Sequence, residues 1–314
     1  MKVSVIVLTC DREHWIGRSI RSILRQDFPD FELLVVDNGS RDASGLIAAE
    51  YARRDPRVRV LRRKRGTISA GRNAGLDAAR GEWIAFFDDD DTAEPDFLSF
   101  LVSLAEETDA DAAACGSWKE VDGAHLPNFI EDRRLLLTPE QAVLELLLRR
   151  RCNAATPTKL FRRSLFSEHR FPERARYDDI AVVYRLFASA RRVAFHNLPK
   201  YCFMRHGGNS SAFTTNDRLL SPAQLREYFA AFHERTRWLS ERLPRLSAFA
   251  RYAEYSYYLS MFAKLTRTHL PDCEPERRWL ADTLREALPW LEPCPWLQDF
   301  ERARLCLLPR KGGR

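Results

Sequence analysis

Short apolar runs alternate with amphipathic stretches along the first hundred residues of the chain. The apolar runs are rich in β-branched and aromatic residues, and each precedes a segment whose apolar residues recur at helical spacing. The predicted strands cover residues 3–8, 31–36, 58–61 and 83–87, and the predicted helices cover residues 15–26, 44–54 and 69–80. Repeated strand–helix–strand units with nearly continuous apolar strands indicate an α/β fold, in which a mostly parallel sheet has helices on both faces.

The pattern is mixed after residue 97 and becomes helical near the C-terminus. It predicts helices at residues 97–107, 139–150 and 180–190 and a strand at residues 112–118. From Pro222 onward, aromatic residues recur at helical spacing, and prolines divide this segment into about four helices. We therefore expect one domain over residues 1–215, with halves at 1–100 and 101–215, and a helical region over residues 216–314.

The composition is that of a globular protein. Of 314 residues, 45% are hydrophobic and 30% are charged, which allows a sizeable core and argues against disorder. No apolar run approaches the roughly 18–20 residues of a membrane-spanning helix, and the N-terminal apolar run is too short for a signal peptide. We expect a cytoplasmic protein. A net charge of +6 leaves peripheral contact with the inner face of the membrane open.

Charge and cysteine spacing argue against two other classes of protein. The arginines that carry the positive charge are dispersed and matched by acids, unlike a nucleic-acid-binding surface, so no nucleic-acid partner is expected. Seven cysteines are scattered along the chain without a CxxC pair. Structural zinc sites and disulfide frameworks need closer, paired spacing, so we expect reduced thiols that are mostly buried.

Acidic turns follow two of the predicted strands. Residues 88–91 are four consecutive aspartates, whose charges repel one another and have no cation nearby in the sequence. Carboxylates of this kind suit Mg²⁺ or Mn²⁺; the alternative is a solvated loop before the next helix. Residues 37–40, Asp-Asn-Gly-Ser, end another strand, and alone they are more typical of an ordinary turn. Ligands of parallel sheets bind at the carboxyl ends of strands, where both turns lie.

Two further segments join these turns in a recognisable order. Residues 9–12, Thr-Cys-Asp-Arg, follow the first strand, and the small residues at 69–75 open a helix; loop formation and close helix–sheet packing explain each one singly. Together the four segments resemble the family 2 glycosyltransferases, nucleotide-sugar-dependent enzymes with the Rossmann-like GT-A fold. The matching stretches are VSVIVLTCDREHWIGRSIRSIL, DFELLVVDNGSRD and SAGRNAGLDAARGEWIAFFDDDD followed by EPDFL. The likeness is close over residues 3–100 and looser over residues 160–211.

The resemblance implies a site for a nucleotide sugar and a divalent metal. The DxD motif of the family maps onto residues 88–90, with a register uncertain by one residue, and Asp90 is the implied ligand of Mn²⁺ or Mg²⁺. His206, in a segment at residues 201–211 that also resembles the family, is the implied second metal ligand. The implied donor-binding residues are Thr9, Asp11, Arg12, Asp37, Arg65, Arg72, Asp88, Asp89 and Arg205.

A second acidic pair stands where the helix at residues 180–190 is predicted to begin. Asp178 and Asp179 resemble the family's element that supplies the general base, and Asp179 is the implied base with Asp178 beside it. The alternative is plain capping of the helix N-terminus. One base on the face opposite the leaving group implies a single displacement with inversion at the anomeric carbon.

These residues together predict a metal-assisted sugar transfer. The donor is a nucleoside-diphosphate sugar, with UDP favoured and hexose and N-acetylhexosamine both open. The acceptor is a hydroxyl of a glycan, lipid-linked sugar, peptide or natural product, and residues 216–314 are expected to select it or to form a homodimer. Two rivals remain. A nucleotidyltransferase would leave Asp178 and Asp179 without a purpose. A non-catalytic nucleotide-sugar-binding scaffold is disfavoured because all the acidic motif positions are filled.

Overall fold

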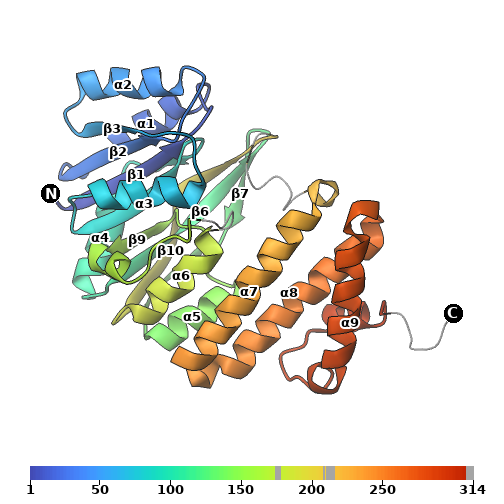
Figure 1. Cartoon of the computed structure of the whole chain (residues 1–314). Coiled ribbons are helices and arrows are strands. Elements are labelled where there is room, and N and C mark those ends of the chain that lie inside the picture. Colours follow the sequence, from blue (N-terminus) through green and yellow to red (C-terminus); the bar gives the residue numbers. More distant parts are fainter. Residues whose placement is uncertain (174–177, 208, 210–215, 309–314) are drawn as a thin grey trace. The chain divides into compact units, whose positions relative to one another are not determined.

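The chain forms two compact units. The structure, a computed structural model, describes residues 1–173, 178–207, 209 and 216–308. The first unit is Met1–Arg205 and the second is His206–Arg314. Strands and helices alternate in the first unit, whereas the second is helical (Figure 1). The α/β class expected from the sequence is confirmed.

The first unit is built on one sheet of ten strands. The strands are β1 (Val3–Thr9), β2 (Phe31–Asp37), β3 (Val58–Arg62), β4 (Trp83–Asp88), β5 (Thr92–Ala93), β6 (Ala112–Val121), β7 (Ala124–Asn128), β8 (Glu131–Leu137), β9 (Lys159–Arg162) and β10 (Val193–Arg205). Their order is β3-β2-β1-β4-β9-β6-β10-β5, with β7 paired to β6 and β8 paired to β10. The four predicted strands of the first hundred residues form the parallel half of this sheet.

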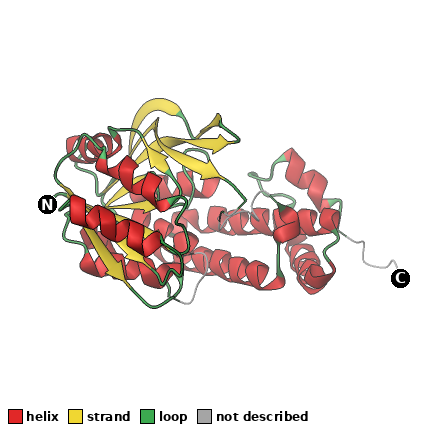
Figure 2. Ribbon diagram, turned by 90° about the horizontal axis from the view of Figure 1, so that it is seen from above, coloured by secondary structure: helices red, strands yellow, loops and turns green. Residues whose placement is uncertain are grey.

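Helices cover both faces of the sheet (Figure 2). They are α1 (Ile16–Leu24), α2 (Ser44–Arg54), α3 (Ile68–Ala78), α4 (Phe97–Glu107), α5 (Pro139–Leu148) and α6 (Asp178–Ser189). Val5 and Val7 of β1 share one apolar core with α1 and α4. Ile6 and Leu8 point to the other face, where Gly75 and Gly71 of α3 leave no room for a Cβ. Central strands buried on both faces explain the continuous apolar runs in the sequence.

Five strands of the first unit are not predicted from the sequence: β5, β7, β8, β9 and β10. β7 and β8 have mostly exposed or half-buried residues and no regular alternation of apolar and polar positions. β10 runs for 13 residues and contains Pro199, at which its pairing with β6 shifts register. These strands form because β6 and β10 offer them partners, which is a tertiary effect that local patterning does not report.

The second unit contains four α-helices within the described residues, as the aromatic pattern predicts. They are α7 (Pro222–Arg242), α8 (Ser247–Thr268), α9 (Glu274–Leu291) and α10 (Asp299–Leu305). α8 packs against each of the other three. Phe232 and Tyr257 stack with ring centroids 3.9 Å apart, and Tyr258 is buried and donates a hydrogen bond to Glu254. The aromatic residues thus build the core of this unit, while its expected part in acceptor choice or dimerisation stays a prediction.

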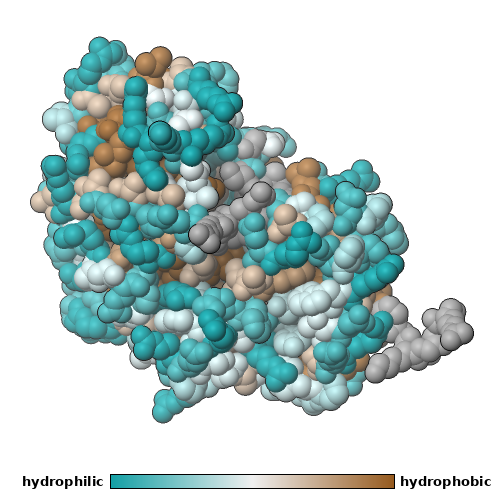
Figure 3. Space-filling view, viewed as in Figure 1, coloured by the Kyte–Doolittle hydropathy of each residue, from teal (hydrophilic) through white to brown (hydrophobic). Residues whose placement is uncertain are grey.

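None of the helices in the described ranges carries an apolar stretch long enough to cross a bilayer. On the face drawn in Figure 3, apolar residues appear as patches among polar ones.

Candidate active site

Three of the predicted motifs meet at one edge of the sheet. The register pairs Thr9 with Asp37 and Leu8 with Asp88, so β1, β2 and β4 end at the same level. Thr9 and Asp37 are buried, and the Asp37 carboxylate accepts a hydrogen bond from the Ser40 backbone at 2.9 Å. These are the carboxyl ends of the strands, where parallel sheets bind their ligands.

The turn after β2 is joined to the segment that carries Arg65. The Asn38 amide donates to the Gly66 carbonyl at 2.9 Å, and Asn38 Oδ1 is buried without a hydrogen-bond partner in the described part of the chain. Asp11 accepts from the Arg41 backbone at 2.7 Å and pairs with Arg65 at 2.8 Å. These contacts lower the pKa of the Asp11 carboxyl, with the Arg41 amide the larger cause. Four donor-binding candidates, Thr9, Asp11, Asp37 and Arg65, therefore lie in one neighbourhood.

Gly39 fixes how closely these two segments approach. Its φ is +87°, and a Cβ on it would collide with the Arg65 backbone. Gly39→Ala is expected to cost about 1–3 kcal/mol of stability and to weaken nucleotide binding, measured by urea unfolding and calorimetry. Gly123→Ala is the matched control, because its φ is +82° and a Cβ there meets nothing within 4 Å. Equal losses in the two variants would mean that backbone strain alone, rather than the Arg65 contact, is responsible.

The acidic turn after β4 contains two buried aspartates, Asp90 and Asp91, and two half-buried ones, Asp88 and Asp89. Asp91 accepts hydrogen bonds from the Tyr201 hydroxyl at 2.7 Å and from the Met204 backbone at 2.8 Å. Burial and the neighbouring Asp88 and Asp90 raise the pKa of Asp91 well above its ordinary value. Asp91 thus ties the turn to β10, and the predicted role of residues 88–90 toward the donor and the metal stays a prediction.

Burial raises the pKa of two of these three aspartates, and neighbouring carboxylates add to the effect. Desolvation by the surrounding protein and the charge of Asp90 raise the pKa of Asp89 to about 7, against a smaller opposing effect of Arg12. Desolvation likewise raises the pKa of Asp88 to about 7, with Arg72 opposing it and Asp90 adding to it. Arg12 Nε lies 3.7 Å from Asp89, and Arg72 Nη2 lies 3.6 Å from Asp88. A cation close to this turn would relieve the repulsion.

Arg72 connects the acidic turn to the second acidic pair. Its guanidinium is buried, lies 2.9 Å from Asp178 and also contacts Asp179. Burial by itself would lower the pKa of Arg72, but the charges of Asp178, Asp179 and Asp88 raise it above its ordinary value. The side chain also lies over the ring of Phe171 at 5.5 Å. Arg72, predicted to contact the donor, is therefore also the bridge between two acidic motifs.

The two members of the second acidic pair have different surroundings. The Asp178 side chain is 6% exposed and accepts the backbone N–H of Asp179, whereas the Asp179 side chain is 26% exposed. Burial raises the pKa of Asp178 to about 6, although Arg72 opposes the change. Thr156, which no sequence motif singles out, donates its hydroxyl to Asp179 at 3.4 Å. Asp179 is thus the accessible carboxylate of the pair.

The remaining predicted site residues lie further along the chain. Arg205 ends β10 and stands over the ring of Phe203 at 5.7 Å. His206 belongs to the second unit, and its backbone donates to Asn209 at 2.7 Å. Residues 208, 210 and 211 of this segment lie outside the described residues. The roles of Arg205 and His206 stay predictions.

The acidic turn fits a divalent cation shared with a phosphate ligand. Within the described ranges, its side chains do not bring three ligand atoms within 4.8 Å of one another. One other group of side chains, away from this turn, does so. Mg²⁺ is usually bound by one or two carboxylates plus the phosphates of a substrate, which this turn can provide.

Comparison with known proteins places the chain in a family. Residues 4–170 match the model of glycosyl transferase family 2. The Bacillus subtilis protein EpsH is 30% identical over 253 residues, which cover 79% of this chain and 73% of EpsH. The glycosyltransferase GlyG of Streptococcus pneumoniae is 29% identical over 66% of this chain and 72% of its own. A shorter match, to the B. subtilis glycosyltransferase EpsJ at 39% identity, spans 41% of that protein.

Solved structures agree on the fold. TarS of S. aureus in complex with UDP-GlcNAc superposes with a TM-score of 0.63 at 23% identity, covering 84% of this chain and 80% of that one. The mannosyltransferase PcManGT of Pyrobaculum calidifontis, with GDP-Man and Mn²⁺, gives a TM-score of 0.56 at 18% identity, over 96% and 82% of the chains.

The fold and the site thus define a glycosyltransferase of the GT-A type. The chain belongs to glycosyltransferase family 2. The resemblance noted in the sequence is confirmed, and membership in this family favours sugar transfer over the nucleotidyltransferase alternative.

Proposed function

We propose that this protein is an inverting glycosyltransferase that moves a sugar from a UDP-sugar to an acceptor hydroxyl with the help of Mn²⁺ or Mg²⁺. The observation that carries the proposal is the Arg72 bridge, which joins the acidic turn at residues 88–90 to the pair Asp178–Asp179. A donor-binding edge and a carboxylate able to accept a proton then lie on either side of one guanidinium. The complexes of TarS with UDP-GlcNAc and with UDP support a uridine nucleotide.

In this proposal the base pocket is formed by the ends of β1 and β2. Asn38 Oδ1 and the buried residues Thr9 and Asp37 offer polar atoms to a nucleobase. Asp11 and Arg65 border the same pocket at the surface. Arg12, Asp88 and Asp89 are then at the level of the ribose and the sugar. A nucleobase pocket next to a carboxylate-rich turn suits a nucleotide whose phosphates share a metal.

The chemical step needs a proton acceptor for the attacking hydroxyl and a positive charge beside the leaving diphosphate. Asp179 accepts the proton of the acceptor hydroxyl as its oxygen forms a bond to the anomeric carbon and the bond from that carbon to the diphosphate oxygen breaks. Asp90 would hold a divalent cation, which would stabilise the negative charge that develops on the leaving diphosphate. Asp179 suits its task because it is accessible, whereas Asp178 is buried against Arg72. Attack opposite the leaving group inverts the anomeric configuration.

The donor half of the proposal is tested by calorimetry with UDP, GDP, dTDP and CDP, first with Mn²⁺ and then with EDTA. We expect UDP to bind and EDTA to remove most of the affinity. Asp90→Asn is expected to weaken the metal-dependent binding at least about tenfold, because replacing residues that support a metal site typically lowers metal affinity by that factor or more. Asp109→Asn is the matched control, since Asp109 is exposed and pairs with Arg191 and Arg192 at the surface.

The outcomes separate the alternatives. If Asp90→Asn keeps full metal-dependent binding, the metal is held elsewhere. If none of the four nucleotides binds, the non-catalytic scaffold for nucleotide sugars is also excluded. If UDP binds but no hydroxyl acceptor is glycosylated across glycans, lipid-linked sugars, peptides and natural products, the scaffold is favoured over the enzyme.

A further inference from the structure

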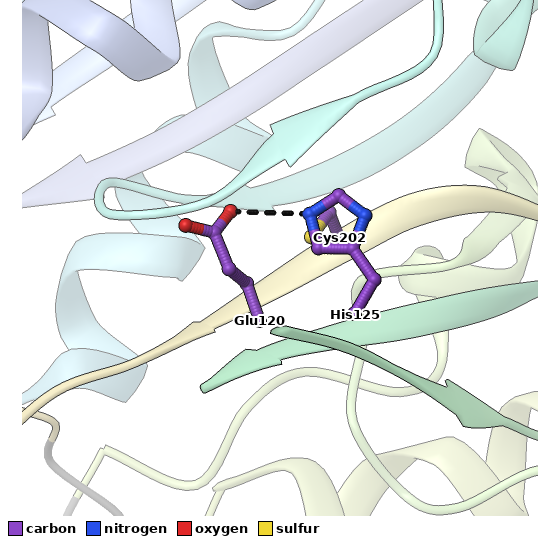
Figure 4. A group of neighbouring side chains, drawn as sticks. All are labelled: Glu120, His125 and Cys202. Atoms are coloured by element: carbon purple, nitrogen blue, oxygen red, sulfur yellow. Dashed lines mark ion pairs between the residues drawn. The ribbon is translucent and has the colours of Figure 1, made fainter. Parts of the chain in front are cut away.

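Three side chains of different metal-binding types meet on the sheet outside the proposed donor site. They are Glu120 of β6, His125 of β7 and Cys202 of β10, and each offers one ligand atom within 4.8 Å of the other two. Figure 4 shows the carboxylate and the imidazole turned toward each other, with the sulfur beside them. Glu120 Oε2 lies 3.4 Å from His125 Nε2.

The strand register brings these three residues to one face. Glu120 and His125 are directly opposite each other in the antiparallel β6–β7 hairpin. Cys202 is opposite Trp118 in the parallel β6–β10 pair, two residues before Glu120, so both side chains point the same way. His125 in turn stacks on Trp118, with ring centroids 6.3 Å apart. The backbone itself therefore holds the three ligand atoms together.

We propose that Glu120, His125 and Cys202 form a zinc site that fastens the β6–β7 hairpin to β10. Thiolate, imidazole and carboxylate are the three protein ligands that zinc takes, at about 2.0–2.3 Å from the metal. Ligand atoms around such an ion are roughly 3–4 Å apart, so the observed group needs only a small contraction. Water completes the four ligands. The site lies in the first unit and does not depend on the proposed transfer reaction.

Two features of the site oppose metal binding. Arg18 Nη2 of α1 lies 3.4 Å from the same Glu120 oxygen that faces His125, so the guanidinium competes with the metal for that carboxylate. Burial, with Glu120 and Asp91 adding to it, raises the pKa of the Cys202 thiol. Zinc must therefore displace Arg18 and release the thiol proton to solvent, a cost met by the metal–sulfur bond.

The test is titration of the full-length protein with Co²⁺, a spectroscopic substitute for zinc. We expect one Co²⁺ to bind with a sulfur-to-metal charge-transfer band and Zn²⁺ to abolish that band. Cys202→Ser is expected to remove the band. His125→Gln changes an exposed residue and is expected to weaken Co²⁺ binding at least roughly 10–100-fold, which is the loss of metal affinity seen when a residue that only supports a metal ligand is replaced. Arg18→Gln is expected to strengthen binding, because it frees Glu120.

Two controls keep this result separate from the proposed donor metal. Cys306→Ser removes an exposed thiol of the second unit, and Asp90→Asn removes the proposed donor-site ligand; both are expected to keep the band. Absence of a charge-transfer band in the unaltered protein, or its persistence in folded Cys202→Ser, would overturn the zinc site. Weaker Co²⁺ binding in Arg18→Gln would also contradict it.

Discussion

Asp179→Asn is expected to remove sugar transfer while leaving nucleotide binding intact. The amide keeps the size of the carboxylate and can still face Arg72 and Thr156, but it has no basic oxygen to take the acceptor proton. Loss of a general base typically lowers the rate about 10²–10⁴-fold. The measurement is kcat for transfer to the acceptor, set beside calorimetry of UDP with Mn²⁺.

The control for this variant is Asp77→Asn. Asp77 is also a helical aspartate paired with an arginine, Arg170, but the pair is exposed and neither residue is among the predicted site residues. Its replacement is expected to change neither transfer nor binding. If Asp179→Asn kept its turnover, another residue would be the base; if it lost nucleotide binding as well, Asp179 would belong to the donor site.

Arg72→Met is expected to be among the most destabilising single changes in the first unit. The methionine fills much of the same space, but it leaves Asp178 and Asp179 next to each other without their shared cation. Removing one partner of a buried ion pair costs about 3–5 kcal/mol. The measurement is the free energy of unfolding in urea. Arg170→Met is the matched control, because its ion pair with Asp77 is exposed and worth at most about 1 kcal/mol.

The loss in Arg72→Met should depend on pH. Burial raises the pKa of Asp178 to about 6 in the folded protein even with Arg72 present, above its ordinary value of 3.8. Without Arg72 that pKa rises further, so the folded state binds a proton that the unfolded chain has already released. Stability therefore falls as pH rises from about 4 to beyond 6, and the deficit is larger at pH 8 than at pH 5. A deficit independent of pH would show that packing, not charge, is lost.

Local pattern accounts well for the parallel half of the sheet. In the first hundred residues, each strand is buried on both faces and each helix has one apolar side. The spacing of apolar residues in the sequence therefore predicts these helices and strands directly. β8 and β10 lack such a signal, since their pairing partners, rather than their own burial pattern, decide that they are strands. The same limit applies to the zinc ligands. His125 and Cys202 are far apart in the sequence and meet only through β6.

The sequence by itself determined the α/β class, the family and the edge of the sheet at which the acidic motifs stand, because strand ends follow from local apolar runs. Only the tertiary structure decided how the charges are balanced. The sequence offers no cation near residues 88–91, yet Arg12 reaches Asp89 and Arg72 reaches Asp88. The tertiary structure also decided that Asp91 accepts a hydrogen bond from Tyr201, a partner 110 residues away. Buried charge has to be matched in space, and the matching groups come from whichever elements the sheet brings together.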